Sequence, residues 1–193
     1  MKKYLTLILL LALGFQGDLF AQESVPPHIK DHITYPVLDF APWVGVMPIE
    51  NPAMPYDPSL DYKIAIDVYG TVKDSTKMHS AFTEIARTYN LHIANGVPAD
   101  KIEIVTVIHG GMSLAAGTNE AYQEKYGIDN PNILAIKELE KVGVKFLMCG
   151  QSMSFWNIPA ESITPEVKIA VSAKTSFVML DQMGFSYLNV SED

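Results

Sequence analysis

The sequence predicts an α/β fold, a mostly parallel five-stranded sheet with helices on both faces. Short apolar runs, each closed by glycine or polar residues, alternate with segments whose apolar residues recur every three or four positions. This alternation continues over residues 61–193, which is typical of a parallel sheet with right-handed crossover connections. With 193 residues, 48% of them hydrophobic, the chain is long enough to form one domain with a full core.

The expected strands are short and mainly apolar, and several are rich in β-branched residues. Runs as apolar as these are typical of strands that are buried on both faces, as in a parallel sheet. They cover residues 62–69, 102–108, 144–148, 167–171 and 185–190.

The clearest helix has one apolar face, formed by residues at steps of four, three, four and four. Asp74, Ser75 and Thr76 have side chains that can cap its start, and Gly96 suits its end. The apolar face comprises Met78, Phe82, Ile85, Tyr89 and Ile93. Further helices are expected within residues 113–128, from Pro131 to Gly143, and from Ser172 to Gly184.

The N-terminus has the pattern of a secretory signal peptide. Lys2 and Lys3 form a short positive region, Leu5 to Phe15 is almost entirely apolar, and Ala21 is a small residue at a suitable cleavage point. The apolar run is short for a bilayer-spanning helix. We therefore expect residues 1–21 to be removed, leaving a periplasmic or secreted protein with no membrane segment.

Residues 22–60 are predicted to form a proline-rich, extended arm before the α/β domain of residues 61–193. Eight of the 12 prolines fall between Pro26 and Pro58, and proline both fixes φ and removes a hydrogen-bond donor. The segment is also too apolar for a flexible linker, so we expect it to wrap over the domain or over a neighbouring subunit. His28 and His32 lack a third ligand and are interpreted as solvated. The apolar residues of the arm are Leu38, Phe40, Trp43, Val46 and Met47.

Charge and cysteine content exclude several classes of protein. The formal net charge is −8 and no basic stripe is present, which argues against nucleic-acid binding. One cysteine allows neither an internal disulfide nor a zinc site of the CxxC kind. A lone cysteine is unusual in an exported protein.

That cysteine, Cys149, follows the apolar run 144–148, and residues 151–156 can form a short helix after it. It is thus expected where a strand ends and a helix begins, at the sheet edge where ligands bind in open α/β folds. Gly150 and Gln151 would present backbone N–H groups that stabilise a thiolate. The side chains of Gln151 and Ser152 are interpreted either as orienting a ligand through hydrogen bonds or as capping the short helix. Two interpretations stay open: a reactive nucleophile, or an inert buried cysteine.

A second strand end carries His109, Gly110 and Gly111. Glycines after a strand let backbone N–H groups approach a small polar ligand or an anion. This run lacks the spacing of a dinucleotide or P-loop motif. His109 is interpreted either as a base or hydrogen-bonding partner of a thiolate, or as a structural residue. These three residues, with Gly150, Gln151 and Ser152, are the expected ligand-binding residues.

Soft donors near Cys149 raise the alternative of a copper(I) site. Consecutive strand residues point to opposite faces of a sheet, so Met148 and Cys149 are not expected to share a metal. The sequence has no HExxH motif, no paired carboxylates and no Ser-His-Asp set. We therefore expect neither a metal nor a cofactor. The soft donors are His109, Met148, Cys149 and Met153.

Five segments carry a family resemblance: DYKIAIDVYG, IEIVTVIHGG, NILAIKELEKVGV, FLMCGQSMSFWNI and VKIAVSAKTSFVMLDQMGFSYLNV. In this order, over about Asp61 to Val190, they resemble the DsrE/DsrF (YchN-like) family. The resemblance implies a flavodoxin-like three-layer sandwich that assembles as trimers or hexamers. In its sulfur-relay members, a cysteine at the position of Cys149 carries a persulfide between donor and acceptor proteins.

Two functional hypotheses follow. In the first, Cys149 is the catalytic residue of an exported sulfur carrier or sulfurtransferase. In the second, the protein is a non-catalytic module that binds a small ligand or a protein, and Cys149 lines the pocket. The signal peptide and the arm depart from the cytoplasmic relay proteins, so whether the chain is an enzyme stays open. Exposure and acidity of the Cys149 thiol distinguish the two hypotheses.

Overall fold

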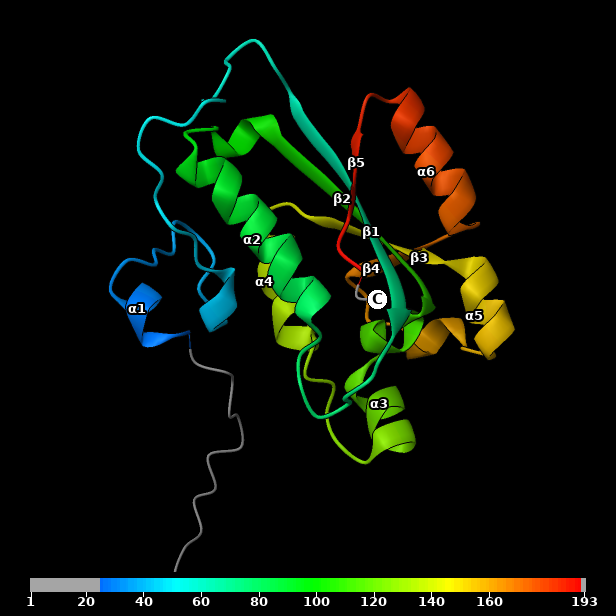
Figure 1. Ribbon diagram of the computed structural model, residues 1–193. Coiled ribbons are helices and arrows are strands. Elements are labelled where there is room, and N and C mark those ends of the chain that lie inside the picture. Colours follow the sequence, from blue (N-terminus) through cyan, green and yellow to red (C-terminus); the bar gives the residue numbers. More distant parts are fainter. Residues whose placement is uncertain (1–24, 192–193) are drawn as a thin grey trace, which may run out of the picture.

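The computed structural model describes residues 25–191, and its strands form one five-stranded sheet in which every neighbouring pair is parallel. The strand order is β4-β3-β2-β1-β5, so β2 is central and β4 and β5 are the edges (Figure 1). The predicted flavodoxin-like α/β fold is confirmed. The strands are β1 (Tyr62–Thr71), β2 (Ile102–Gly111), β3 (Lys145–Cys149), β4 (Val167–Ala170) and β5 (Ser186–Asn189).

Helices cover both faces of the sheet. On one face, α2 and α4 bury Phe82 and Ile136 in the larger apolar cluster, and on the other, α6 buries Ala173 and Leu180 in a smaller one. No helix in the described part of the chain is long and apolar enough to cross a membrane. The α-helices are α1 (Pro27–Lys30), α2 (Ser80–Ala94), α3 (Asn119–Tyr126), α4 (Ile133–Lys141), α5 (Gly150–Trp156) and α6 (Ala173–Gln182). Short 3₁₀ helices are η1 (Pro42–Val44), η2 (Ala99–Lys101), η3 (Met112–Ala116) and η4 (Ala160–Ser162).

The start of α2 differs from the sequence prediction. The helix begins at Ser80, and the His79 ring accepts the N–H of Ala81 through Nδ1 at 3.2 Å. Asp74, expected to help cap this helix, instead accepts the backbone N–H and the hydroxyl of Thr76 in a separate turn. Several residues there can cap a helix, and tertiary contacts select among them.

The start of α4 also differs, because the helix begins at Ile133 rather than at Pro131. The two flanking asparagines form a buried hydrogen-bonded turn, in which Asn130 Oδ1 accepts the N–H of Asn132 at 2.9 Å. Asn132 Oδ1 in turn accepts the N–H of His79 at 2.8 Å, which ties this turn to the start of α2. Side-chain hydrogen bonds thus hold Pro131 outside the helix.

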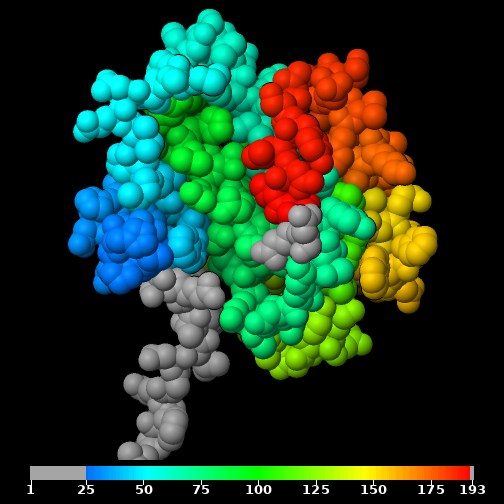
Figure 2. Space-filling view, viewed as in Figure 1, coloured from blue at the N-terminus to red at the C-terminus, as the bar shows by residue number. Residues whose placement is uncertain are grey.

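The arm lies over α2, as the space-filling view shows, with its blue and cyan residues against the green of that helix (Figure 2). Buried Asn90 of α2 holds it in place. The amide oxygen of Asn90 accepts the N–H of Leu38 at 3.1 Å, and its amide nitrogen donates to the carbonyls of Leu38 and Val44, both at 2.8 Å. Leu38 and Val44 also enter the larger apolar cluster, so the arm is part of the core. The expected signal peptide, residues 1–21, lies outside the described residues.

We predict that Asn90→Leu destabilises the protein strongly, although Leu has the same branched arrangement of side-chain heavy atoms as Asn. The substitution leaves three buried backbone groups of the arm unpaired, and each such group costs about 1–3 kcal/mol. We expect the free energy of unfolding in guanidinium chloride to fall by at least about 2 kcal/mol. The control is Asn95→Leu, at the exposed end of the same helix. Equal losses in both variants would contradict this role of Asn90.

Candidate functional site

Cys149 is the last residue of β3 and the N-cap of α5. Its Sγ accepts the N–H of Ser152 at 3.4 Å, so the sulfur caps the helix as an oxygen side chain usually does. Met148, one residue earlier, lies in the larger apolar cluster, whereas Cys149 lies in the smaller cluster beneath α6. The two side chains therefore occupy opposite faces of the sheet.

Hydrogen bonds lower the pKa of the Cys149 thiol by more than burial raises it. Burial opposes ionisation, but hydrogen bonds from the hydroxyl and the N–H of Ser152, and from the N–H groups of Ala173 and Gln151, hold the pKa of the thiol below its ordinary value. Ala173 is the first residue of α6, so the starts of α5 and α6 converge on the sulfur. Helix N-termini carry a partial positive charge that favours a thiolate.

The thiol is nevertheless poorly accessible, because Cys149 is only 5% exposed. Close packing beside it explains Gly150, whose added Cβ would lie 2.8 Å from the carbonyl oxygen of Ala170. Any larger residue there would push α5 away from β4. Gln151 is exposed, whereas Ser152 is partly buried. The starts of α5 and α6, which donate hydrogen bonds to the sulfur, thus cover it.

The strand end at β2 is packed as closely as that at β3. Gly110 has φ +64°, and an added Cβ would lie 2.7 Å from the ring of Tyr69. A Cβ on Gly111 would lie 2.9 Å from the carbonyl oxygen of Gly70. The N–H of Gly110 donates to Ser152 Oγ at 2.9 Å. These glycines permit close contact between β1 and β2, and one of their N–H groups is used within the protein.

His109 forms a hydrogen-bonded group with two residues that the sequence analysis missed. Its Nε2 lies 2.7 Å from Asp67 Oδ1, and the hydroxyl of Tyr187 donates to the other oxygen of Asp67. Burial opposes ionisation of Asp67, but hydrogen bonds from His109 and Tyr187 hold its pKa below the usual value. The bond to Asp67, with burial, raises the pKa of Tyr187 to about 12. The sequence did offer one sign that Asp67 has a special role, because it is an acidic residue within the apolar run 62–69.

The parallel register aligns this group with Cys149. Tyr69 of β1 is paired with His109 of β2, and Ile108 is paired with Met148 of β3. One residue further along, His109 and Cys149 occupy adjacent strands on the same face of the sheet. Ser152 links the two strand ends, because it bonds to both Gly110 and Cys149.

The described residues contain no cluster of three or more His, Cys, Asp or Glu side chains that could hold a metal. The side chains considered as copper(I) ligands lie in two different apolar clusters. Met148 and Met153 belong to the larger cluster, and Cys149 belongs to the smaller one.

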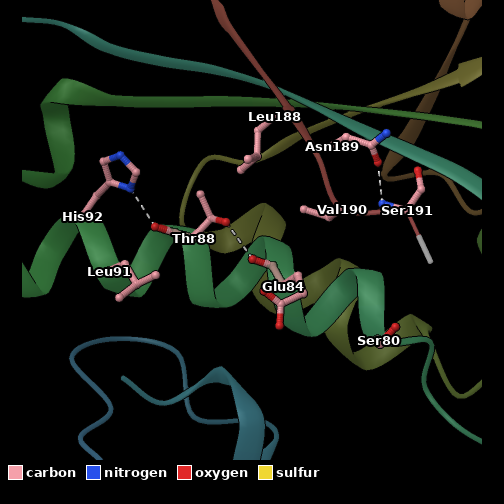
Figure 3. Close-up of a pocket in the computed structure, with 9 residues that line it drawn as sticks. All are labelled: Ser80, Glu84, Thr88, Leu91, His92, Leu188, Asn189, Val190 and Ser191. Atoms are coloured by element: carbon pink, nitrogen blue, oxygen red, sulfur yellow. Dashed lines mark hydrogen bonds between the residues drawn. The ribbon is translucent and has the colours of Figure 1, made fainter. Parts of the chain in front are cut away.

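Two open hollows lie on the described part of the chain near α2 and α5, and the second touches the site. The first is an open groove between α2 and the β5 segment, and it contains none of the expected site residues (Figure 3). The second lies between α5 and β4 and includes Gly150 and Ile169. Cys149 lines neither hollow. The first groove is lined by Ser80, Glu84, Thr88, Leu91, His92, Leu188, Asn189, Val190 and Ser191.

Comparisons with known proteins identify the family. The model of the DsrE/DsrF-like family matches residues 63–190. The chain belongs to the DsrE/DsrF-like family. The comparison with curated proteins found no match for this DsrE-like chain. Among solved structures, it is similar to a protein of unknown function from Methanobacterium thermoautotrophicum, with 17% identity over 67% of this chain and 99% of that chain, and a TM-score of 0.46.

We predict that the Cys149 thiol of the DsrE-like domain titrates below the ordinary pKa of about 8.5, and that Ser152→Ala raises its pKa. The variant removes one hydrogen bond to the thiolate and leaves the N–H groups in place. The measurement is the alkylation rate against pH for folded protein, with the unfolded chain as reference. Ser154→Ala is the matched control, since Ser154 bonds to the Gly150 carbonyl on the same helix. Slow alkylation at every pH would identify Cys149 as an inert core residue.

Proposed function

We propose that the protein is an exported sulfur carrier in which Cys149 holds sulfane sulfur as a persulfide. Membership of the DsrE/DsrF-like family suggests a role in sulfur relay. The observation that carries the proposal is the hydrogen bonding of the Cys149 thiol, which lowers its pKa where two helices begin. A thiolate is the form that attacks sulfur.

Loading transfers one sulfur atom without net oxidation. The Cys149 thiolate attacks the outer sulfur of a donor persulfide, RSSH, and the donor S–S bond breaks. The donor leaves as a thiolate, RS⁻, and takes up a proton, while Cys149 becomes Cys149–SSH. Delivery is the reverse step with an acceptor thiol, and Cys149 then leaves as a thiolate. A low pKa favours that departure.

A persulfide also eases the access problem. The S–S bond is about 2.05 Å long, so the outer sulfur lies further from the Cα than Sγ does. An incoming thiol attacks this outer atom and not the Sγ, which is buried with the rest of Cys149. The acceptor protein of the proposed relay would therefore meet the outer sulfur near the starts of α5 and α6, whereas loading requires the donor persulfide to reach Sγ itself.

The alternative function is a non-catalytic module that binds a small ligand or a protein. The 5% exposure of Cys149 favours it, because a relay cysteine has to be reached. In that case the bonds from Ser152 and Ala173 only satisfy a buried thiol.

The proposal places the protein in the periplasm or outside the cell, because residues 1–21 have the pattern of a signal peptide. A single cysteine is compatible with an oxidising compartment, because its thiol has no second cysteine in the chain with which to form a disulfide. An oxidising compartment would require that the relay partners protect the persulfide.

We also propose that the chain assembles as a trimer or hexamer. Exposed apolar side chains on α5, α6 and β5 support assembly, since large apolar patches usually mark interfaces. Phe155 of α5 is the most exposed of these side chains, at 93%. Others on these elements are Trp156, Val178, Met179 and Tyr187, and Val171 and Met183 flank α6.

Persulfide loading tests the proposed function. We predict that the protein, incubated with glutathione persulfide, gains the mass of one sulfur atom, and that a thiol reductant removes it. Cys149→Ser removes the only thiol and should gain nothing, while keeping the fold because the volume change is small. Native mass spectra before and after reduction give the result. Absence of the adduct on wild-type protein would leave the binding-module hypothesis in its place.

For assembly, we predict a mass of three or six chains by light scattering at micromolar concentration. Phe155→Ser and Met179→Ser each remove an exposed apolar side chain, and at least one should weaken the assembly. Leu134→Ser is the matched control, because Leu134 is an exposed residue of α4, on the face of the sheet opposite α6. A single-chain mass over the whole concentration range would contradict the assembly.

A further inference from the structure

His109 is fixed from three sides and remains accessible. The Tyr69 ring centroid lies 4.9 Å from that of His109, the Phe177 ring of α6 stands edge-on at 6.4 Å, and Asp67 bonds to Nε2. The His109 side chain is 22% exposed, against 12% for Asp67. The imidazole is therefore held in one orientation at the protein surface, above a buried carboxylate.

The partners of Asp67 determine where the proton of His109 lies. An ionised carboxylate only accepts hydrogen bonds, and Tyr187 donates to one of the Asp67 oxygens. Nε2 of His109 must therefore donate to the other oxygen, so neutral His109 carries its proton on Nε2. Its Nδ1 then has a free lone pair and is the atom able to take a proton.

The ionisable groups around His109 come from three strands. Asp67 and Tyr69 belong to β1, Tyr187 to β5, and Cys149 to the neighbouring β3, while α6 presents the uncharged Phe177. His109 and Cys149 therefore lie on adjacent strands at the sheet edge where a thiol would meet the outer sulfur on Cys149.

We propose that His109 is the proton acceptor for thiols that exchange sulfur with Cys149, and that Asp67 and Tyr187 are its positioning residues. This inference rests on the proposed sulfur transfer and adds the group that activates the incoming thiol. Cys149 cannot itself act as this base during delivery, because its sulfur carries the persulfide.

The delivery step conserves atoms and electrons. The acceptor thiol RSH gives its proton to Nδ1 of His109 as its sulfur bonds to the outer sulfur of Cys149–SSH. The S–S bond to Cys149 breaks, its electron pair goes to Cys149, and the acceptor becomes RSSH. His109 then returns the proton to the Cys149 thiolate or to solvent. No oxidant or reductant is consumed.

The experiment uses the full-length protein loaded with glutathione persulfide and measures sulfur transfer to glutathione from about pH 6 to pH 10. His109→Gln keeps a donor toward Asp67 but has no proton acceptor. We expect transfer near neutral pH to slow by about 10²-fold, the lower end of the usual effect of a general base. Above the glutathione thiol pKa, ordinarily about 8.5, the deficit should disappear because the acceptor ionises unaided.

Asp67→Asn and Tyr187→Phe test positioning. Asp67→Asn should slow transfer by about tenfold near neutral pH, with the same recovery at high pH, and Tyr187→Phe should have a smaller effect of the same form. His92→Gln is the matched control, since His92 lies on α2 and bonds to the Thr88 carbonyl. Its transfer rate should equal that of the wild type.

Alkylation by iodoacetamide separates proton transfer from damage to the site. Iodide leaves without a proton and no second thiol takes part, so His109→Gln should alkylate at the wild-type rate above the Cys149 pKa. Equal slowing of alkylation and transfer would show a structural role and overturn the inference. Wild-type transfer kinetics in His109→Gln would also overturn the inference, but the proposed sulfur carriage by Cys149 would still stand. Failure of the wild type to load would remove both proposals.

Discussion

The all-parallel register of β1, β2 and β3 is the constraint on which the candidate site depends. Because the three strands run in the same direction, their carboxyl ends meet at one edge, and Tyr69, His109 and Cys149 fall on adjacent strands of one face. A slip of one residue in any strand would turn its side chain to the opposite, α2-covered face. Gly110 and Gly150 protect this register, since a side chain at either position would collide with a neighbouring strand.

Burial and hydrogen bonding act in opposite directions on both acidic groups of the site. For Cys149 and for Asp67, loss of hydration raises the pKa, and donors from neighbouring elements lower it by more. Each group is therefore ionised more readily than its burial alone would allow. Ser152 is common to the two halves of the site, because its hydroxyl accepts from Gly110 and bonds to the Cys149 sulfur.

The arm shows the same use of side chains to satisfy buried backbone groups. A segment rich in proline can pair only some of its own N–H and C=O groups, so its other buried backbone groups need partners elsewhere. Asn90 supplies three such bonds, and Thr34 pairs with Val46 through backbone bonds at 2.8 Å. The domain boundary expected near residue 60 thus separates two segments of the sequence that share one core.

The sequence by itself determined the order of strands and helices, the helices on both faces and the position of Cys149 between β3 and α5, because these depend on periodicity and on nearby residues. Only the tertiary structure brought Asp67, His109 and Tyr187 together. His109 is 42 residues and Tyr187 is 120 residues from Asp67 along the chain. The tertiary structure also decided that His79 rather than Asp74 caps α2, and that Cys149 is buried. Local patterns specify which way a side chain points along its own element, whereas strand order and helix packing decide what it meets.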